Sequence, residues 1–133
     1  MKQRGYTLIE LMVVVVVIAI LGVIGIPSYR AYMLRAQRTE AKDALVRLAT
    51  NQERFYLQNN TYTADVDVLG FNGGVTDTGL YDIEVTAADQ QGFVAVVTPA
   101  ATSGMMADVE CVEFSIDQTG AHSADPDPNG RCW

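Results

Sequence analysis

The chain has 133 residues, and its 16 acidic and 9 basic residues give a formal net charge of −7 at pH 7. This length suffices for one small domain plus an extended segment. Much of the apolar content lies in the first thirty residues, so the remainder is a polar domain with a modest core.

The charges are also segregated along the chain. Between Ser28 and Arg54 the basic residues outnumber the acidic ones, whereas from Phe55 onward a single base, Arg131, stands against twelve acids. We therefore expect a basic rod that carries an acidic head. An acidic surface repels phosphate, which argues against nucleic acid as a partner of the head. The simplest role of this charge is to keep an exposed domain soluble.

The first expected element is an apolar helix over residues 6–29, which contains one carboxylate, Glu10. At roughly 1.5 Å per residue it would measure about 36 Å, enough to cross a bilayer core of about 30 Å. A carboxylate in such a helix is costly, so Glu10 is a candidate functional residue whose cationic partner has to be found.

The residues before this helix predict its orientation and processing. Lys2 and Arg4 precede it, which places the N-terminus in the cytoplasm and the remaining domain outside the membrane. A small-residue processing site at Gly5–Tyr6 lies before the apolar run rather than after it. Cleavage there would remove a leader of residues 1–5 and leave the new α-amine of Tyr6 four residues from Glu10.

The run Arg4-Gly5-Tyr6-Thr7-Leu8-Ile9-Glu10, followed by the apolar stretch, resembles the class III signal of type IV pilins and type II secretion pseudopilins. That family usually has Phe at the position of Tyr6. The resemblance implies cleavage between Gly5 and Tyr6 by prepilin peptidase and N-methylation of Tyr6. It also implies that Glu10 faces the terminal amine of a neighbouring subunit. The alternative is a plain membrane anchor that tolerates Glu10.

Gly22, Gly25 and Pro27 form a second cluster within the apolar segment. Pro27 removes a backbone donor and clashes with the carbonyl of Val23, and glycine weakens a helix. These positions favour a kinked helix. In the family this region can kink or melt when the subunit enters a filament; a kink without function is the alternative.

An amphipathic helix is expected over residues 30–59, with an apolar stripe that repeats every seven residues. The stripe comprises Leu34, Ala41, Leu48 and Phe55, and Arg30, Arg38, Arg47 and Arg54 are placed largely off it. We expect this stripe to dock on a sheet. A coiled coil is less favoured because the intermediate positions Arg38 and Gln52 are polar.

A connecting loop over residues 60–79 and a β-sheet over residues 80–123 follow. Alternation of apolar and polar residues predicts strands at 81–86 and 111–116, with a mostly apolar strand at 92–98 between them and a short strand at 121–123. Short turns separate these segments. The expected fold class is α+β: a long N-terminal helix packed on a four-stranded antiparallel meander.

Cys111 and Cys132 are the only cysteines of the chain. In an exported domain one disulfide is the default, and it would close a loop over residues 111–132 that contributes roughly 3 kcal/mol by the loop-entropy model. Two reduced, buried cysteines are the cytosolic alternative.

No catalytic constellation is visible. His122 is the sole histidine, no serine has a visible histidine–acid arrangement, and no glycine-rich phosphate loop is present. We therefore expect no enzymatic activity and no cofactor. One weak calcium candidate is Asp125, Asp127 and Asn129, which match the opening of a D-x-D-x-N-G loop. The bidentate Glu of such a loop is missing, so a rigid turn is the alternative.

Motifs in residues 40–45, 51–56 and 60–63, and the ending Cys111…Asp117-Gln118-Thr119-Gly120…Cys132-Trp133, resemble a pilin subgroup. It contains minor pilins of gamma- and betaproteobacteria and the DNA-receptor pilin of natural competence. The resemblance implies a ladle-shaped minor pilin of a type IV pilus, held first in the inner membrane and then in the extracellular filament. The implied partners are other pilin subunits, prepilin peptidase and the assembly machinery. A type II secretion pseudopilin and a DNA-binding competence pilin are the alternatives.

Overall fold

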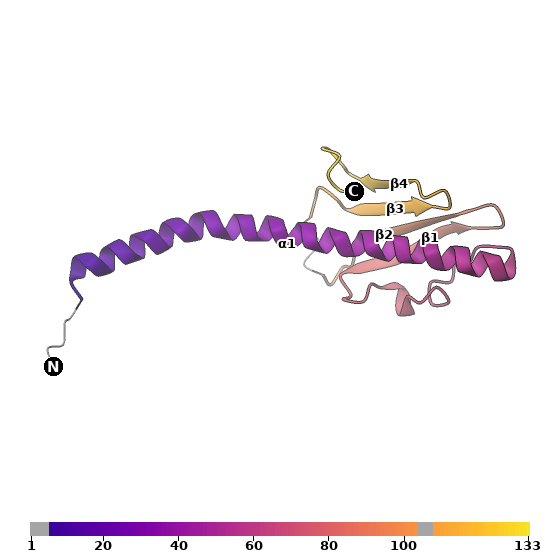
Figure 1. Cartoon of the computed structure of the whole chain (residues 1–133), viewed down its shortest axis with the longest axis horizontal. Helices are drawn as coiled ribbons and strands as arrows, with labels where there is room; N and C mark the ends of the chain where they lie inside the picture. Colours follow the sequence, from indigo (N-terminus) through magenta and orange to yellow (C-terminus); the bar gives the residue numbers. More distant parts are fainter. Residues whose placement is uncertain (1–5, 104–107) are drawn as a thin grey trace. The chain divides into compact units, whose positions relative to one another are not determined.

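The computed structural model describes residues 6–103 and 108–133. The chain divides into two compact units, Met1–Met33 and Leu34–Trp133. We call the second unit the head. One helix, α1 (Leu8–Asn59), contributes to both units, and the remaining elements belong to the head (Figure 1).

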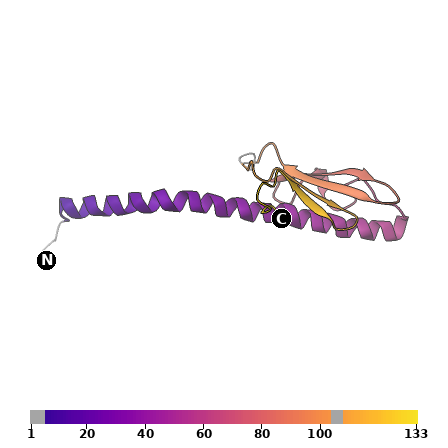
Figure 2. The same cartoon turned by 90° about the horizontal axis from the view of Figure 1, so that it is seen from above.

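The head consists of the second half of α1 and one four-stranded antiparallel sheet. The strands β1 (Tyr81–Ala88), β2 (Phe93–Pro99), β3 (Glu113–Asp117) and β4 (His122–Asp125) lie in the spatial order β1-β2-β3-β4. The helix runs along one face of this sheet (Figure 2). The predicted α+β class and the antiparallel meander are therefore confirmed.

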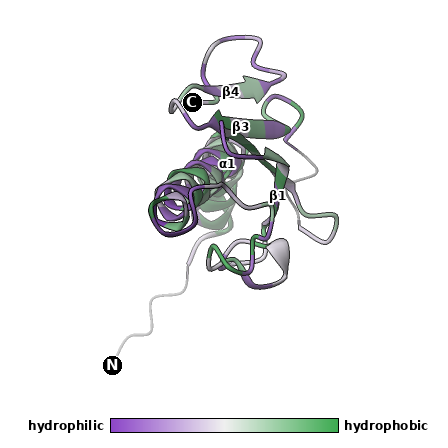
Figure 3. Cartoon of the chain, turned by 90° about the vertical axis from the view of Figure 1, so that its right-hand side faces the viewer, coloured by the Kyte–Doolittle hydropathy of each residue, from purple (hydrophilic) through white to green (hydrophobic). Residues whose placement is uncertain are grey.

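Alternating burial along the strands explains why the sheet needs a helix. In β1 the residues Tyr81, Ile83 and Val85 are buried and the residues between them are exposed. The same alternation in β2 and β3 turns one apolar face toward Leu45 and Leu48 of α1, which are both fully buried. Green hydrophobic segments of the strands lie beside α1 in an end-on view (Figure 3). Burial of this apolar area is the main favourable term in the folding of the head.

The segment between α1 and β1 contains one short 3-10 turn, η1 (Asn72–Gly74), and is attached to the helix by polar contacts. The Arg47 guanidinium donates to Asp77 at 2.7 Å and lies 5.3 Å from the ring centroid of Phe71. The Asn51 amide donates to the carbonyl of Leu69. The helix ends beside this segment because Asn60 adopts a positive φ of 56°, a left-handed conformation that asparagine tolerates.

Two polar residues, Arg38 and Gln52, lie on the buried face of α1, and the burial of Arg38 corrects the sequence analysis. Arg38 was expected off the apolar stripe, yet it is only 7% exposed. It can be buried because Asp108, 70 residues later, pairs with it through two bonds of 2.6 and 2.7 Å. Gln52 is fully buried, and its amide exchanges two hydrogen bonds with the backbone of Thr63. Both side chains form hydrogen bonds with residues outside α1: Arg38 with a carboxylate far along the chain, and Gln52 with the backbone of the segment that follows the helix.

The end of the chain is closed by the predicted disulfide. Cys111 and Cys132 are bonded at 2.02 Å and are both buried. Trp133 packs edge-on against Phe114 of β3, with ring centroids 6.1 Å apart, and its indole N–H donates to the carbonyl of Ser123. The disulfide and the indole thus attach the last residues to β3 and β4.

We expect the Arg38–Asp108 pair to be a strong determinant of head stability. Arg38→Met leaves the Asp108 carboxylate buried without its cation, which should lower the free energy of unfolding by about 3–5 kcal/mol. The double variant Arg38→Met/Asp108→Leu removes both charges and should recover most of that loss. Thermal and urea unfolding of the full chain in detergent measures the stability of the single and the double variant. Equal instability of the two variants would contradict this account.

The phenol of Tyr81 should make the head sensitive to alkali. It is fully buried, and its hydroxyl has no hydrogen-bond partner among the described residues. Burial, and next the charge of Asp108, raises the Tyr81 pKa far above its usual value near 10. Above about pH 10 the unfolded chain therefore loses a proton that the folded head retains, and stability falls as the pH rises.

Tyr81→Phe should reduce this alkaline loss and leave stability near neutral pH unchanged or higher by about 1 kcal/mol, since an unsatisfied hydroxyl is removed. Unfolding midpoints between pH 8 and pH 11 provide the measurement. Tyr56→Phe, at a half-buried tyrosine, is the matched control and should leave the decline of the unfolding midpoint with pH unchanged. An unchanged slope in Tyr81→Phe would show that another group causes it.

Candidate functional site

The helix that contains Glu10 starts with a capping arrangement. Thr7 precedes the first helical residue, and its hydroxyl oxygen accepts a bond of 3.4 Å from the backbone N–H of Glu10. Its carbonyl accepts the first helical bond, from Leu11. The spacing Thr-x-x-Glu is that of a capping box, and an acid in the first turn is favourable at the positive end of the helix dipole. The sequence analysis missed this role of Thr7, although the Thr-x-x-Glu pattern indicates it.

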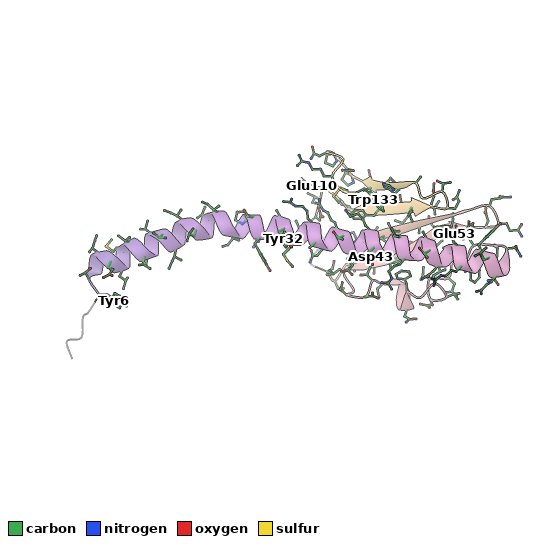
Figure 4. All side chains as sticks on the ribbon, viewed as in Figure 1. Tyr6, Tyr32, Asp43, Glu53, Glu110 and Trp133 are labelled. Atoms are coloured by element: carbon green, nitrogen blue, oxygen red, sulfur yellow. A yellow bond between two sulfur atoms is a disulfide. The ribbon has the colours of Figure 1, made fainter. Side chains whose placement is uncertain are left out.

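The Glu10 carboxylate itself has no cationic partner in the part of the chain that the structure describes; the ion pairs there involve Arg38 and Arg47. It borders a hollow of about 240 Å³ that Tyr6, Leu11 and Val14 also line. Figure 4 shows Tyr6 at the start of the helix. An anion on an apolar helix is costly unless a cation pairs with it, and a neighbouring molecule can supply that cation. Gly5 and the rest of the leader, residues 1–5, lie outside the described residues.

The surface around Glu10 is apolar and uncovered. The large hydrophobic side chains from Leu8 to Ile26 are each about half exposed or more, between 49% and 78%. The helix is long and apolar enough in this segment to cross a membrane. Contiguous exposed apolar surface of this extent is a contact surface for lipid or for other helices.

Gly22, Gly25 and Pro27 lie within the continuous helix. A Cβ at Gly22 or Gly25 would meet nothing within 4 Å, so neither glycine is required by a close contact within this chain. Pro27 cannot donate to the Val23 carbonyl, and the Ser28 hydroxyl donates to the next carbonyl, that of Ile24, at 3.1 Å. The backbone therefore has one helical hydrogen bond fewer at Pro27. The kink or melting expected at this point stays a prediction.

The outer face of the head sheet is acidic. Asp82 and Glu84 on β1, Glu113 on β3 and Asp125 on β4 are all exposed, and the four strands β1 to β4 contain no lysine or arginine. Such a face repels phosphate. Four of the twelve acids that follow Arg54 thus lie together on one face of the sheet.

The weaker candidates have structural roles. His122 lies 4.3 Å from the ring of Trp133, measured between centroids, and its Nδ1 is 3.3 Å from the carbonyl oxygen of Gly120. Asp127, from the calcium-like sequence, accepts the backbone N–H groups of Arg131 and Cys132. These bonds form a turn, and the calcium candidate at Asp125, Asp127 and Asn129 stays a prediction. Asp125 belongs to β4, and the described residues contain no group of three acidic, histidine or cysteine side chains suited to a metal ion.

Two family models match the chain. Residues 1–26 match a model described as a prokaryotic N-terminal methylation motif, which covers the segment with Tyr6 and Glu10. Residues 27–115, more than half of the chain, match a model described as "Type IV minor pilin ComP, DNA uptake sequence receptor".

Curated relatives give a consistent result at the family level. The chain is 33% identical over 127 residues to the type IV major pilin protein PilA of Myxococcus xanthus, an alignment that covers 96% of this chain and 56% of PilA. It is 34% identical over 112 residues to the type IV major fimbrial protein FimA of Dichelobacter nodosus, covering 81% of this chain and 66% of FimA. The chain thus spans between half and two thirds of the length of these relatives.

Solved structures support the fold. The non-core minor pilin PilV of Neisseria meningitidis aligns with a TM-score of 0.54 at 22% identity, over 70% of this chain and 87% of PilV. A type IV pilin from Shewanella oneidensis aligns with a TM-score of 0.52 at 24% identity, over 75% of this chain and 97% of that pilin. With an N-terminal methylation motif, a pilin family model over residues 27–115 and a pilin fold, the chain belongs to the type IV pilin family.

Proposed function

We propose that this pilin is a non-enzymatic structural subunit of a type IV pilus that moves from the inner membrane into a helical filament. The observation that carries this proposal is the Glu10 carboxylate, which lies without a cation on an apolar helix surface. In the membrane, lipid covers that surface. In the filament, the same surface packs against the helices of neighbouring subunits.

The proposed assembly steps assign a role to each N-terminal feature. Prepilin peptidase cleaves between Gly5 and Tyr6, and the new amine of Tyr6 is methylated. Glu10 of one subunit then pairs with the terminal amine of another, which neutralises the anion and sets the register between the two helices. Gly22, Gly25 and Pro27 allow the helix to bend or melt locally as it leaves the membrane. This chain has no recognisable nucleotide-binding loop, so the assembly machinery supplies the work.

Whether the subunit is rare or abundant in the filament is a finer question. The matching family model describes a minor pilin and supports the minor role, whereas PilA and FimA are named as major proteins. Mass spectrometry of sheared filaments measures copy number directly, together with cleavage and methylation at Tyr6.

A type II secretion pseudopilin is the alternative assembly role. A deletion strain that loses protein secretion but keeps its pili would favour it.

The Glu10 step predicts an incorporation defect. Glu10→Ala and Glu10→Gln both remove the anion, and we expect at least about a tenfold loss of the subunit from sheared filaments at unchanged cellular level. Immunoblots of the sheared and cellular fractions make this comparison. Asp43→Asn, at an exposed acid of the same helix in the head, is the matched control and should incorporate normally. Normal incorporation of both Glu10 variants would refute the proposed role.

DNA binding is the second candidate function, because the matching model describes a DNA uptake sequence receptor. The electrostatics oppose it: the sheet face is acidic, and the side chains of Arg38 and Arg47 are already paired with carboxylates. We expect no salt-sensitive retardation of duplex DNA by the full chain in detergent at low salt. A basic DNA-binding protein on the same gel confirms the sensitivity of the assay. Retardation that disappears as salt is added would instead support a receptor role.

A further inference from the structure

Two acids face each other on the outer surface of the head. The register of β3 and β4 places Glu113 directly opposite Asp125, and both are exposed. Like charges at directly opposed positions of a sheet are destabilising. Among the described residues neither acid forms an ion pair, and Arg131, the one base after Arg54, pairs with neither. The head thus carries a repulsive pair that a cation from outside would relieve.

A groove bordered by the Arg54 side chain lies between α1 and the segment that follows it. Its volume is about 340 Å³, and its walls include Arg54, Phe55 and Val68. Arg54 is exposed and, within the residues that the structure covers, forms no ion pair. Val68, on the rim, is 59% exposed. The groove therefore offers a guanidinium beside an apolar wall.

The groove and the acidic pair lie at opposite ends of the head. Arg38, near the start of the head helix, bonds to Asp108, just before β3. Figure 4 shows the labelled Glu110 and Glu53 at opposite ends of the head. The sixteen residues from Arg38 to Arg54 span about 24 Å of helix, well beyond a Debye length of about 8 Å at physiological salt. Arg54 therefore cannot neutralise Glu113 and Asp125 of its own head.

We propose that Arg54 of one copy docks on the Glu113–Asp125 pair of a second copy. The inference rests on the proposed filament role and deepens it by naming a contact between heads. A second copy is the occupant that the charges favour, because each head presents Arg54 at one end and the Glu113–Asp125 pair at the other. A planar guanidinium can bond two carboxylates at once. A contact between different surfaces of identical subunits leaves a free surface at each end and extends as an open filament.

Exposed apolar side chains accompany the charges on both sides of this contact. Val109 is 73% exposed and Val112 is 43% exposed, and both precede Glu113 within four residues. They can cover Val68 on the rim of the groove when Arg54 reaches the acids. Removing water from these side chains would strengthen the charge pairing at the centre of the contact.

A charge-preserving substitution makes this contact directly visible. Arg54→Lys keeps the cation and introduces an amine that a carbodiimide couples to a neighbouring carboxylate. In intact filaments we expect an amide cross-link between position 54 of one copy and Glu113 or Asp125 of another, mapped by mass spectrometry. Adding Glu113→Gln and Asp125→Asn should abolish it. Lys42, the natural lysine of the head, reports non-specific coupling in the same sample.

Charge reversal tests the energetic side of the contact. Arg54→Glu and Glu113→Arg should each reduce filament incorporation about fivefold, and combining them should recover most of the loss, because opposite charges again face each other. All of these side chains are exposed, so the fold should persist, and thermal unfolding verifies this. Glu84→Arg, a reversal on β1 of the same sheet face, is the matched control and should incorporate normally.

The outcomes separate this inference from the proposed function. If the chain enters filaments but the position-54 amine couples to no second copy, or only to a different pilin, the contact is overturned and the filament role stands. Failure of the double reversal to recover incorporation likewise overturns the contact. If the chain is absent from filaments altogether, the filament role fails and this contact fails with it.

Discussion

The apolar surface of α1 between Leu8 and Ile26 is the constraint on which the rest of this protein depends. Its side chains are uncovered within the chain, so the subunit always needs lipid or other helices around this segment. One carboxylate, Glu10, makes the requirement more specific, because hydrocarbon alone leaves that anion without a partner. A neighbouring helix that also supplies a cation satisfies both demands. The proposed filament role rests on this combination of exposed apolar area and one unpaired carboxylate.

The head solves a different problem, which is to keep a small domain stable while leaving its outer face polar. Its core is a thin layer between one helix and one sheet face, so much of its cohesion comes from attachments between distant segments. Arg38 binds Asp108, Arg47 binds Asp77, and the disulfide between Cys111 and Cys132 joins the chain end to the start of β3. These attachments use Arg38 and Arg47, two of the six basic residues of α1. Among the described residues, no ion pair involves an acid of the four strands.

Membership in the pilin family establishes the fold but not the contacts of the head. The matching model is that of a DNA uptake sequence receptor, yet the strands of this chain bear acids and no lysine or arginine. A surface of this sign suits cationic partners rather than phosphate. Function in this family is therefore better argued from the residues on the head than from the shared scaffold.

The sequence by itself determined those features that depend on local pattern. The apolar run, the helical stripe and the alternation in the strands were sufficient to predict the α+β class, and the residues from Arg4 to Glu10 carried the resemblance to a class III signal. The exported context led to the expected pairing of Cys111 with Cys132, which the structure confirms. Periodicity reports which side chains share a face, and it needs no knowledge of distant partners.

Only the tertiary structure decided which polar residues are buried. Arg38 was placed largely off the apolar stripe, and that was wrong, because Asp108 lies 70 residues away in sequence and neutralises it. Gln52 is buried for the same kind of reason, since the backbone of Thr63 satisfies its amide. The opposition of Glu113 and Asp125 likewise emerges only from the register of β3 and β4. Long-range pairing and strand register depend on how remote segments meet, and no local pattern encodes that.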